Sequence, residues 1–400
     1  MRLKLFIVIV CFSSNLQAQS WQQTTDFPGA NRDDAVAFTI DNIAFCGTGQ
    51  TPWFDPANDF YSFDMITYQW TQIADMPTPQ GRQYACGFDN DTLGFVFGGE
   101  NGSNFFNELY AYDPVLDSWT VKSSLPSDGR SGSACFTIEN KAYIVGGRTE
   151  ELQFTDEIWE YNMTTDSWTQ KNNFPYGNKW RITGASNDTS GYVIFGFDNT
   201  LGYSNELYEY DPTNDIWSIL SNFPDAARNY ASIEFINNQL IILFGMDSTN
   251  QFYNDVHLYN LSTDQWQTGA SLPDLPRRGG QIFSKGLDLF YTTGLLNSPK
   301  RTNETWVLEN PTSNLISLET KKITVFPCPT SNVLKIKCTS YEGMQQIIVV
   351  NSVEGEYIAT FNINSSQSQL DVSTFNLGTY IITIIDQNGN KLSQSKFVKR

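Results

Sequence analysis

The sequence predicts an all-β protein, in which a six-bladed β-propeller is followed by a small β-sandwich. The main observation is a fixed spacing: tryptophans recur every 49 residues, at Trp21, Trp70, Trp119, Trp168, Trp217 and Trp266. A second series, of acidic residues, keeps the same period, eleven residues before a tryptophan position, at Asp59, Glu108, Glu157, Glu206, Asp255 and Glu304. A period of about 40 to 50 residues with four short strands per unit is typical of a propeller in which each unit forms one blade.

Residues 82–119 show the content of one unit. Two apolar strands at 84–88 and 93–97 are followed by a glycine pair, a third strand at 108–112, and an Asp-Pro turn before the tryptophan. Apolar runs of this length, bounded by turn residues, are typical of strands, and the outermost strand carries the tryptophan.

The number of strands predicts how the ring closes. An outer strand at 20–25 stands alone, five complete units follow, and the last unit ends at its third strand, at 304–308. We therefore expect the first strand to complete the sixth blade, which leaves no open sheet edge between the first blade and the last.

The unit resembles the kelch repeat. The resemblance rests on the glycine pair after an apolar strand, on the third strand with its acidic and aromatic residues, and on the tryptophan. Both glycines are kept at Gly98-Gly99 and Gly146-Gly147, and the other units keep one. The resemblance implies the propeller fold and leaves the ligand open.

The two ends of the chain differ from the repeats. Residues 1–18 combine Arg2 and Lys4 with a short apolar run and a final alanine, which predicts a cleaved secretory signal peptide. The run is too short to span a membrane. We expect the propeller at 19–310, a linker at 311–318 and a β-sandwich domain at 319–400.

The last domain resembles the C-terminal sorting domain of the bacterial type IX secretion system. Three segments carry the resemblance, at 325–330, 376–381 and 396–400, with Cys328 where the family has asparagine. The resemblance implies a two-membrane bacterium, contact of residues 319–400 with the secretion machinery, and a protein that is secreted or held at the outer cell surface.

The chain has a net charge of −18, and the acidic excess lies in the propeller, where 15 Lys and Arg against 37 Asp and Glu give −22; the last 90 residues have 8 against 6. An acidic surface repels phosphates, so nucleic acid is not an expected partner. No cofactor or metal site is expected, because none of the cysteines has ligand spacing. Cys86 and Cys135 occupy equivalent positions in neighbouring units, either as small buried residues or as a pair. Cys328 and Cys338 are a second possible pair.

No catalytic residue is assigned. The one histidine, His257, occupies a strand position that is aromatic in other units, which favours a structural role. A Ser-His-Asp triad would need it as the base, and a copper site would need two histidines. The alternative that stays open is an extracellular sugar-active enzyme of the six-bladed kelch epimerase type, which acts on acidic sugars with arginine and carboxylate groups.

One face of the propeller carries the candidate binding residues. The loops that enter the innermost strands carry Arg32, Arg82, Arg130, Arg181, Arg228, Arg277 and Arg278, and the loops between the second and third strands carry aromatic residues. Arginine and aromatic residues are enriched at recognition sites. The arginines have two interpretations: buried pairs with the repeated acids, or a ring that binds an anionic ligand.

We assign the regular arginines Arg32, Arg82, Arg130 and Arg228 to structural pairs with the repeated acids. The candidate ligand-binding residues are Trp53, Phe54, Phe105, Phe106, Trp180, Arg181, Arg277 and Arg278. The residues that break the repeat, Trp180, Arg181 and Arg278, are the strongest of these. The predicted function is a secreted or cell-surface binding module for a protein or glycan ligand.

Overall fold

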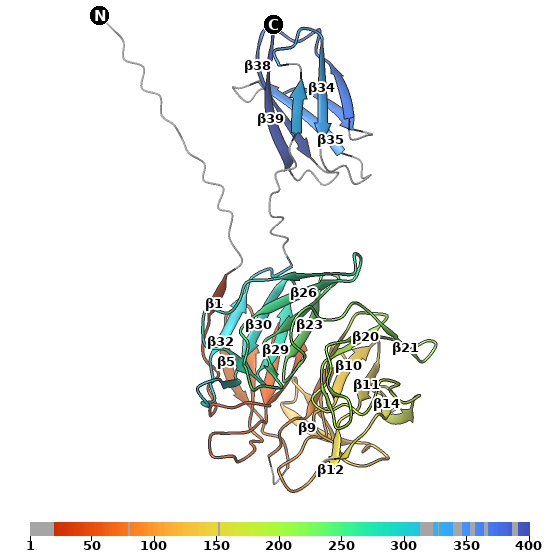
Figure 1. The fold of residues 1–400 in the computed structure, drawn as a ribbon. Helices are drawn as coiled ribbons and strands as arrows, with labels where there is room; N and C mark the ends of the chain where they lie inside the picture. The colour runs from red at the N-terminus through yellow and green to blue at the C-terminus, as the bar shows by residue number, and fades with distance from the viewer. Residues whose placement is uncertain are drawn as a thin grey trace, which may run out of the picture. The chain divides into compact units, whose positions relative to one another are not determined.

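The structure, a computed structural model, describes residues 20–78, 81–150, 153–312, 323–326, 328–338, 346–352, 357–363, 367–385 and 391–400. Every regular element in these ranges is a β-strand (Figure 1). The predicted signal peptide and residues 313–318 of the predicted linker lie outside them. The chain divides into two compact units, Met1–Thr312 and Ser313–Arg400.

The first unit holds six four-stranded antiparallel sheets, each with its strands in the order inner to outer. Blades one to three are β2 (Val36–Ile40), β3 (Ile43–Gly47), β4 (Phe60–Asp64) and β5 (Gln69–Ile73); β6 (Cys86–Asp89), β7 (Gly94–Phe97), β8 (Leu109–Asp113) and β9 (Ser118–Lys122); and β10 (Ala134–Ile138), β11 (Lys141–Val145), β14 (Ile158–Asn162) and β15 (Ser167–Gln170). Blades four to six are β16 (Thr183–Ser186), β17 (Gly191–Ile194), β20 (Leu207–Asp211) and β21 (Ile216–Ile219); β23 (Ser232–Ile236), β24 (Gln239–Leu243), β26 (Val256–Asn260) and β27 (Gln265–Thr268); and β29 (Gln281–Lys285), β30 (Asp288–Thr292), β32 (Thr305–Leu308) and β1 (Trp21–Gln23).

The sixth blade joins both ends of the propeller, as the strand count predicts. β1 pairs with β32 in antiparallel register, with Trp21 opposite Leu308 (Figure 1). The Trp21 indole donates a 2.8 Å hydrogen bond to the carbonyl of Ala270 in the preceding blade. The same bond to the preceding blade is made by Trp70, Trp119, Trp168 and Trp266. The tryptophan period is thus a series of links between blades.

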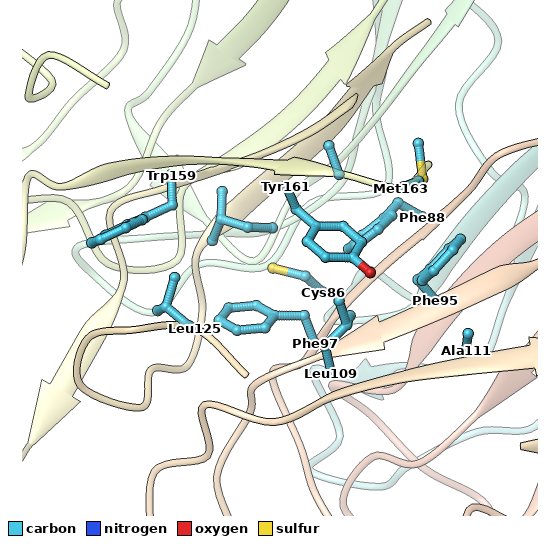
Figure 2. Packing of buried hydrophobic residues seen from close by; sticks show 12 residues of the cluster. Cys86, Phe88, Phe95, Phe97, Leu109, Ala111, Leu125, Trp159, Tyr161 and Met163 are labelled. Atoms are coloured by element: carbon cyan, nitrogen blue, oxygen red, sulfur yellow. The ribbon is translucent and has the colours of Figure 1, made fainter. Parts of the chain in front are cut away.

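Apolar side chains fill the space between adjacent blades. Between blades two and three, Phe97 and Leu109 pack with Ile144, Trp159 and Tyr161, all of them buried (Figure 2). Burial of one such large side chain stabilises the fold by about 1.5–3 kcal/mol. The second strand of each blade is buried on both faces, which explains its continuous apolar sequence.

Small two-stranded sheets hold the loops over one face of the propeller. They are β12 (Arg148–Glu150) with β13 (Gln153–Phe154), β18 (Phe197–Asp198) with β19 (Gly202–Tyr203), β22 (Arg228–Asn229) with β25 (Met246–Asp247), and β28 (Arg277–Arg278) with β31 (Leu295–Leu296). Isolated bridges from Asp33 to Gln50 and from Gln83 to Glu100 occupy the same place in blades one and two. We call this side of the propeller the loop face.

The second unit is a β-sandwich. One sheet contains β33 (Ile323–Phe326), β34 (Val333–Cys338) and β37 (Gln367–Asp371); the other contains β36 (Tyr357–Ile363), β35 (Gln346–Ser352), β38 (Gly378–Ile385) and β39 (Lys391–Lys399). Leu334 and Leu370 of the first sheet share a buried cluster with Val350, Ile382 and Phe397 of the second. In the described part of the chain, no helix is long and apolar enough to cross a membrane.

Candidate functional site

Five arginines at the repeat position are almost completely buried: Arg32, Arg82, Arg130, Arg228 and Arg277. Four of them lie against the repeated acid of their own blade. Their closest oxygen contacts are 2.7 Å for Arg32–Asp59 and Arg130–Glu157, 2.8 Å for Arg228–Asp255, and 3.0 Å for Arg277–Glu304. A hydrogen bond to the end of the second strand fixes the guanidinium in some blades, as from Arg32 to the carbonyl of Thr48. Arg277, which the sequence placed among the candidate ligand contacts, lies in this buried repeat position.

Blade two differs in this contact. Arg82 donates a 2.8 Å hydrogen bond to the carbonyl of Gly98, and its guanidinium lies 4.5 Å from the ring centre of Phe106. Among the described residues, Arg82 and Glu108 form no ion pair within 4.0 Å. Burial lowers the pKa of Arg82, and the nearby Glu108 partly offsets this. Phe106 is thus a packing partner of a buried arginine.

Blade four has a lysine at the repeat position. Lys179 lies 49 residues after Arg130 and 49 before Arg228, and it is 2% exposed. The backbone carbonyl of Lys179 accepts a hydrogen bond from the N–H of Gly147, just as the carbonyl of Arg130 accepts one from the N–H of Gly99. Burial lowers the pKa of Lys179. Sequence reasoning missed this residue, and the 49-residue period is the signal that identifies it. Arg181 lies two residues beyond the repeat position.

Arg181 belongs to a second ring of equivalent positions. These residues are Asp34, Tyr84, Gly132, Arg181, Tyr230 and Gly279, all with a left-handed backbone and φ between 55° and 66°. Five of these residues donate a backbone hydrogen bond to the carbonyl of the equivalent residue in a neighbouring blade. The donor–acceptor pairs are Asp34 to Gly279, Tyr84 to Asp34, Gly132 to Tyr84, Arg181 to Gly132, and Gly279 to Tyr230. All six line the central cavity. This belt of backbone bonds surrounds one mouth of the cavity and places the side chains of Asp34, Tyr84, Arg181 and Tyr230 there.

Arginine and aromatic side chains alternate across this mouth. The guanidinium of Arg148 lies 4.4 Å from the ring centre of Trp180; that of Arg181 lies 3.7 Å from Trp180 and 3.7 Å from Tyr230; that of Arg278 lies 3.7 Å from Tyr230. We call these five residues the arginine–aromatic stack. Each contact stabilises a cation on the negative face of a ring. The loops of blades three to six contribute to the stack.

Carboxylates balance the two ends of the stack but not its centre. Arg148 is ion-paired to Glu100, and Arg278 lies 3.6 Å from the carboxylates of both Asp33 and Asp34. Within the described residues, Arg181 forms no ion pair; its Nη2 donates a 3.0 Å hydrogen bond to the hydroxyl of Tyr84. The central arginine is therefore a half-buried cation without a counter-ion.

Several buried polar atoms of this cluster have no hydrogen-bond partner in the protein. They are the Nε atoms of Arg148, Arg181 and Arg278, the indole nitrogen of Trp180, and one carboxylate oxygen each of Asp33 and Asp34. An unsatisfied buried polar group costs about 1–3 kcal/mol. Four of these atoms are donors, and donors without partners in the protein are one requirement of a site for an anionic group.

The carboxyl group of Asp34 differs from an ordinary aspartate. Burial, reinforced by the neighbouring Asp33 and opposed by Arg278, raises the pKa of Asp34 from 3.8 to about 8. Asp34 is therefore mostly protonated at neutral pH and does not neutralise Arg181. Burial also raises the pKa of Tyr84 well above its usual value. The raised pKa of Asp34 thus weakens the negative charge beside Arg181 and Arg278 at the centre of the loop face.

The cavity below the belt has a volume of about 430 Å³ and follows the inner strands. Small residues such as Ala37, Gly87 and Ala185 form much of its wall. A second hollow of about 320 Å³, lined by acidic residues including Asp89 and Glu139, shares residues with it. The two ends of the central cavity therefore differ in charge.

The other predicted aromatic residues lie further from the centre. Trp53 and Phe54 are 78% and 74% exposed, in the loop between β3 and β4. The guanidinium of Arg301 lies 5.0 Å from the ring centre of Phe54. Phe105 is half-buried, 5.2 Å from the guanidinium of Arg148 and thus beside the stack.

His257 contacts Asp255, the repeated acid of its own blade. Its Nε2 is 3.1 Å from Asp255, which Arg228 also binds. Although burial opposes it, bonds from His257 and Arg228 lower the pKa of Asp255. Asp225, Asp255 and His257 place one possible ligand atom each within 4.8 Å of one another. However, Arg228 is ion-paired to both aspartates, so its guanidinium already supplies the positive charge that a metal would bring.

The fold is a β-propeller whose loop face carries an arginine-rich centre, and comparison with known proteins gives its family. Residues 6–181 and 122–294 match the KLHDC2/KLHL20/DRC7 Kelch-repeats domain, and residues 324–400 match the Secretion system C-terminal sorting domain. The chain belongs to the Kelch-repeat family and carries a type IX sorting domain, which directs it to the cell surface or beyond.

A solved structure supports the fold. The chain described as "Structure of YjhT" superimposes with a TM-score of 0.62 at 17% identity, over 70% of this chain and 95% of that one. At this identity the likeness establishes the fold alone. The comparison with curated proteins gave no match.

Proposed function

We propose that this protein is an exported binding module that holds a protein or glycan ligand on its loop face, where Arg181 contacts an anionic group of the ligand. One observation carries this proposal: Arg181 lies 3.7 Å from the rings of both Trp180 and Tyr230, forms no ion pair within the described residues, and keeps an unpartnered Nε.

The stack fixes the guanidinium before a ligand arrives. A planar guanidinium binds a carboxylate through two parallel hydrogen bonds, and little side-chain entropy is lost when aromatic rings already hold it. The unpartnered indole nitrogen of Trp180 adds a further donor beside it. Trp53 and Phe54, both highly exposed, offer apolar faces to a sugar ring or an apolar side chain at the rim of the same face.

A second candidate function is an extracellular enzyme that acts on acidic sugars. The observation in its favour is Asp34, whose carboxyl has a pKa near 8 and lies in the same belt as Arg181 and Tyr84. A carboxyl that is protonated at neutral pH can act as a general acid. Arg181 would then orient the acid group of the sugar.

The test is binding of the purified full-length protein to an array of acidic and neutral glycans and peptides, compared with the Arg181→Gln variant. Loss of a charged contact costs about 2 kcal/mol or more, so we expect affinity for acidic probes to fall at least about 30-fold. Lys122→Gln removes the same charge from the outer strand β9 and is the matched control.

Three results are informative. Selective binding of acidic probes that Arg181→Gln abolishes and Lys122→Gln retains supports the proposal. Equal binding of acidic and neutral probes, or no effect of Arg181→Gln, overturns it. Conversion of an acidic sugar, lost in Asp34→Asn, establishes the enzyme instead.

A further inference from the structure

Two cysteines occupy the same repeat position in neighbouring blades. Cys86 is the first residue of β6, the inner strand of blade two, and Cys135 lies 49 residues later in β10, the inner strand of blade three. These inner strands lie side by side around the central cavity. Both cysteines are free thiols in this structure.

Each sulfur atom reaches across to the other strand. The Sγ of Cys135 lies 3.3 Å from the carbonyl of Gly87, and the Sγ of Cys86 lies 3.6 Å from the carbonyl of Ser133. A hydrogen bond with Cys135, together with burial, raises the pKa of the Cys86 thiol well above its usual value. The two thiols therefore lie on facing strands, each beside the backbone of the segment that carries the other. Figure 2 shows Cys86 within the apolar layer between the two blades.

We propose that Cys86 and Cys135 form a disulfide that links the inner strands of blades two and three in the exported protein. The sorting domain directs this chain out of the cytosol, into surroundings where disulfides persist. Because each sulfur atom already lies beside the other cysteine's segment, side-chain rotation can bring the two to the S–S bond length of about 2.05 Å. This assignment does not depend on the proposed binding function.

The oxidant is a disulfide-carrying thiol compound of the export compartment. The thiolate of Cys135 attacks one sulfur of that disulfide, so the oxidant's S–S bond breaks and its first thiolate leaves. The thiolate of Cys86 then attacks the sulfur of Cys135 in the mixed disulfide, and the second oxidant thiolate leaves. The two protons lost by the cysteines end on the two released thiols, and two electrons pass to the oxidant.

Burial determines when the bond forms. Cys86 is 4% exposed and stays protonated in the folded blade, whereas Cys135 is half-buried and lines the cavity. The thiolate is the reactive species, so the second attack is fastest before the two blades have packed. We expect oxidation to accompany folding after export.

The test is peptide mapping of exported protein that is alkylated under denaturing conditions without a reductant. We expect the Cys86 and Cys135 peptides to be linked, two hydrogen atoms lighter than the separate peptides, and unlabelled. Because the bond closes a long loop, reduction is expected to lower the melting temperature by roughly 5 °C. Alkylation of both cysteines, or a linkage of either to another cysteine, overturns the proposal.

Variants separate the disulfide from loss of packing. Cys86→Ala and Cys135→Ala are each expected to make the melting temperature insensitive to reductant. Cys46→Ala is the matched control, because Cys46 is a fully buried cysteine in blade one and pairs with neither thiol. It is expected to keep the reductant-sensitive shift. If Cys46→Ala removes the shift and Cys86→Ala keeps it, the assignment is wrong. Mapping of the wild-type protein decides the question even if a variant does not fold.

Discussion

Arg32 and Asp59 meet through two parallel hydrogen bonds, 2.7 and 2.9 Å long, although 27 residues separate them in the sequence. The guanidinium is completely buried, and the carboxylate side chain is 25% exposed. Two strands of one blade are thereby fixed to each other at the loop face. The equivalent contacts between Arg228 and Asp255 are 2.8 and 3.1 Å. These ion pairs fix the relative positions of the segments that carry the loops of the loop face.

The first prediction concerns this pair. Removal of one partner of a buried ion pair leaves the other without compensation, so Arg32→Ala is expected to lower the free energy of unfolding by about 3 kcal/mol. Asp59→Ala should cost at least as much, because it leaves the fully buried guanidinium of Arg32 without its counter-ion, whereas Arg32→Ala leaves a carboxylate that is partly solvated. In urea unfolding experiments, the double variant should cost less than the sum of the two single variants. Strict additivity would show that the two side chains do not interact.

The second prediction compares two arginines of the loop face. Arg82 is completely buried, donates a hydrogen bond to Gly98 and packs on Phe106. The side chain of Arg278 is 13% exposed, and its carboxylate neighbours are 3.6 Å away, which is longer than a hydrogen bond. Arg82→Ala is therefore expected to lower the free energy of unfolding by about 2–3 kcal/mol, and Arg278→Ala by clearly less. A thermal-shift comparison measures the difference. Equal losses would remove the distinction between a structural arginine and a ligand-facing one.

The third prediction concerns pH. The pKa of Asp34 is raised from 3.8 to about 8, so between these values the folded protein binds more protons at this site than the unfolded chain does. The contribution of Asp34 to the free energy of unfolding must then fall as pH rises, by on the order of 1 kcal/mol per pH unit.

Asp34→Asn is expected to flatten this dependence in urea unfolding between about pH 5 and pH 8. Asp41→Asn is the control, because Asp41 has the same left-handed backbone, with φ of 53°, but lies exposed at a turn. Asparagine tolerates that conformation as aspartate does. A pH profile of Asp34→Asn that equals the wild-type profile would contradict the raised pKa.

The fourth prediction concerns ring closure. Deletion of residues 20–25 removes β1 and exposes the edge of β32, so we expect a large fall in melting temperature or aggregation through that edge. Trp21→Phe keeps the strand but loses the bond to Ala270 and part of the buried ring, at a cost of about 1–3 kcal/mol. An unchanged melting temperature after the deletion would show that β1 does not hold the ring closed.

The fifth prediction concerns export. Residues 313–400 form a compact unit apart from the propeller, so their deletion should leave the propeller folded. The truncated protein should remain in the periplasm, as measured by cell fractionation and by the melting temperature of the recovered protein. Normal amounts of truncated protein outside the cell would refute the sorting role of this unit.

The sequence was sufficient for the architecture because the signals are periodic. A tryptophan or an acid that recurs every 49 residues occupies the same place in each blade, and a residue repeated six times at a fixed spacing is easy to detect. The count of 24 strands predicted that β1 completes blade six, and its pairing with β32 agrees. The sorting domain could also be predicted from the sequence, because each of its three characteristic segments is a short continuous stretch.

Only the tertiary structure decided where each arginine lies and what it contacts. Arg277 and Arg278 are neighbours in the chain, yet Arg277 is buried in a repeat pair and Arg278 lies on Tyr230 at the mouth of the cavity. Arg181 and Tyr230 come from two blades and occupy equivalent positions of the belt, where the guanidinium of Arg181 lies against both Tyr230 and Trp180. The alternation of residues along a strand specifies on which face of the sheet each side chain lies. The distance between side chains of different blades depends on how the ring closes, and no local segment of the sequence encodes it.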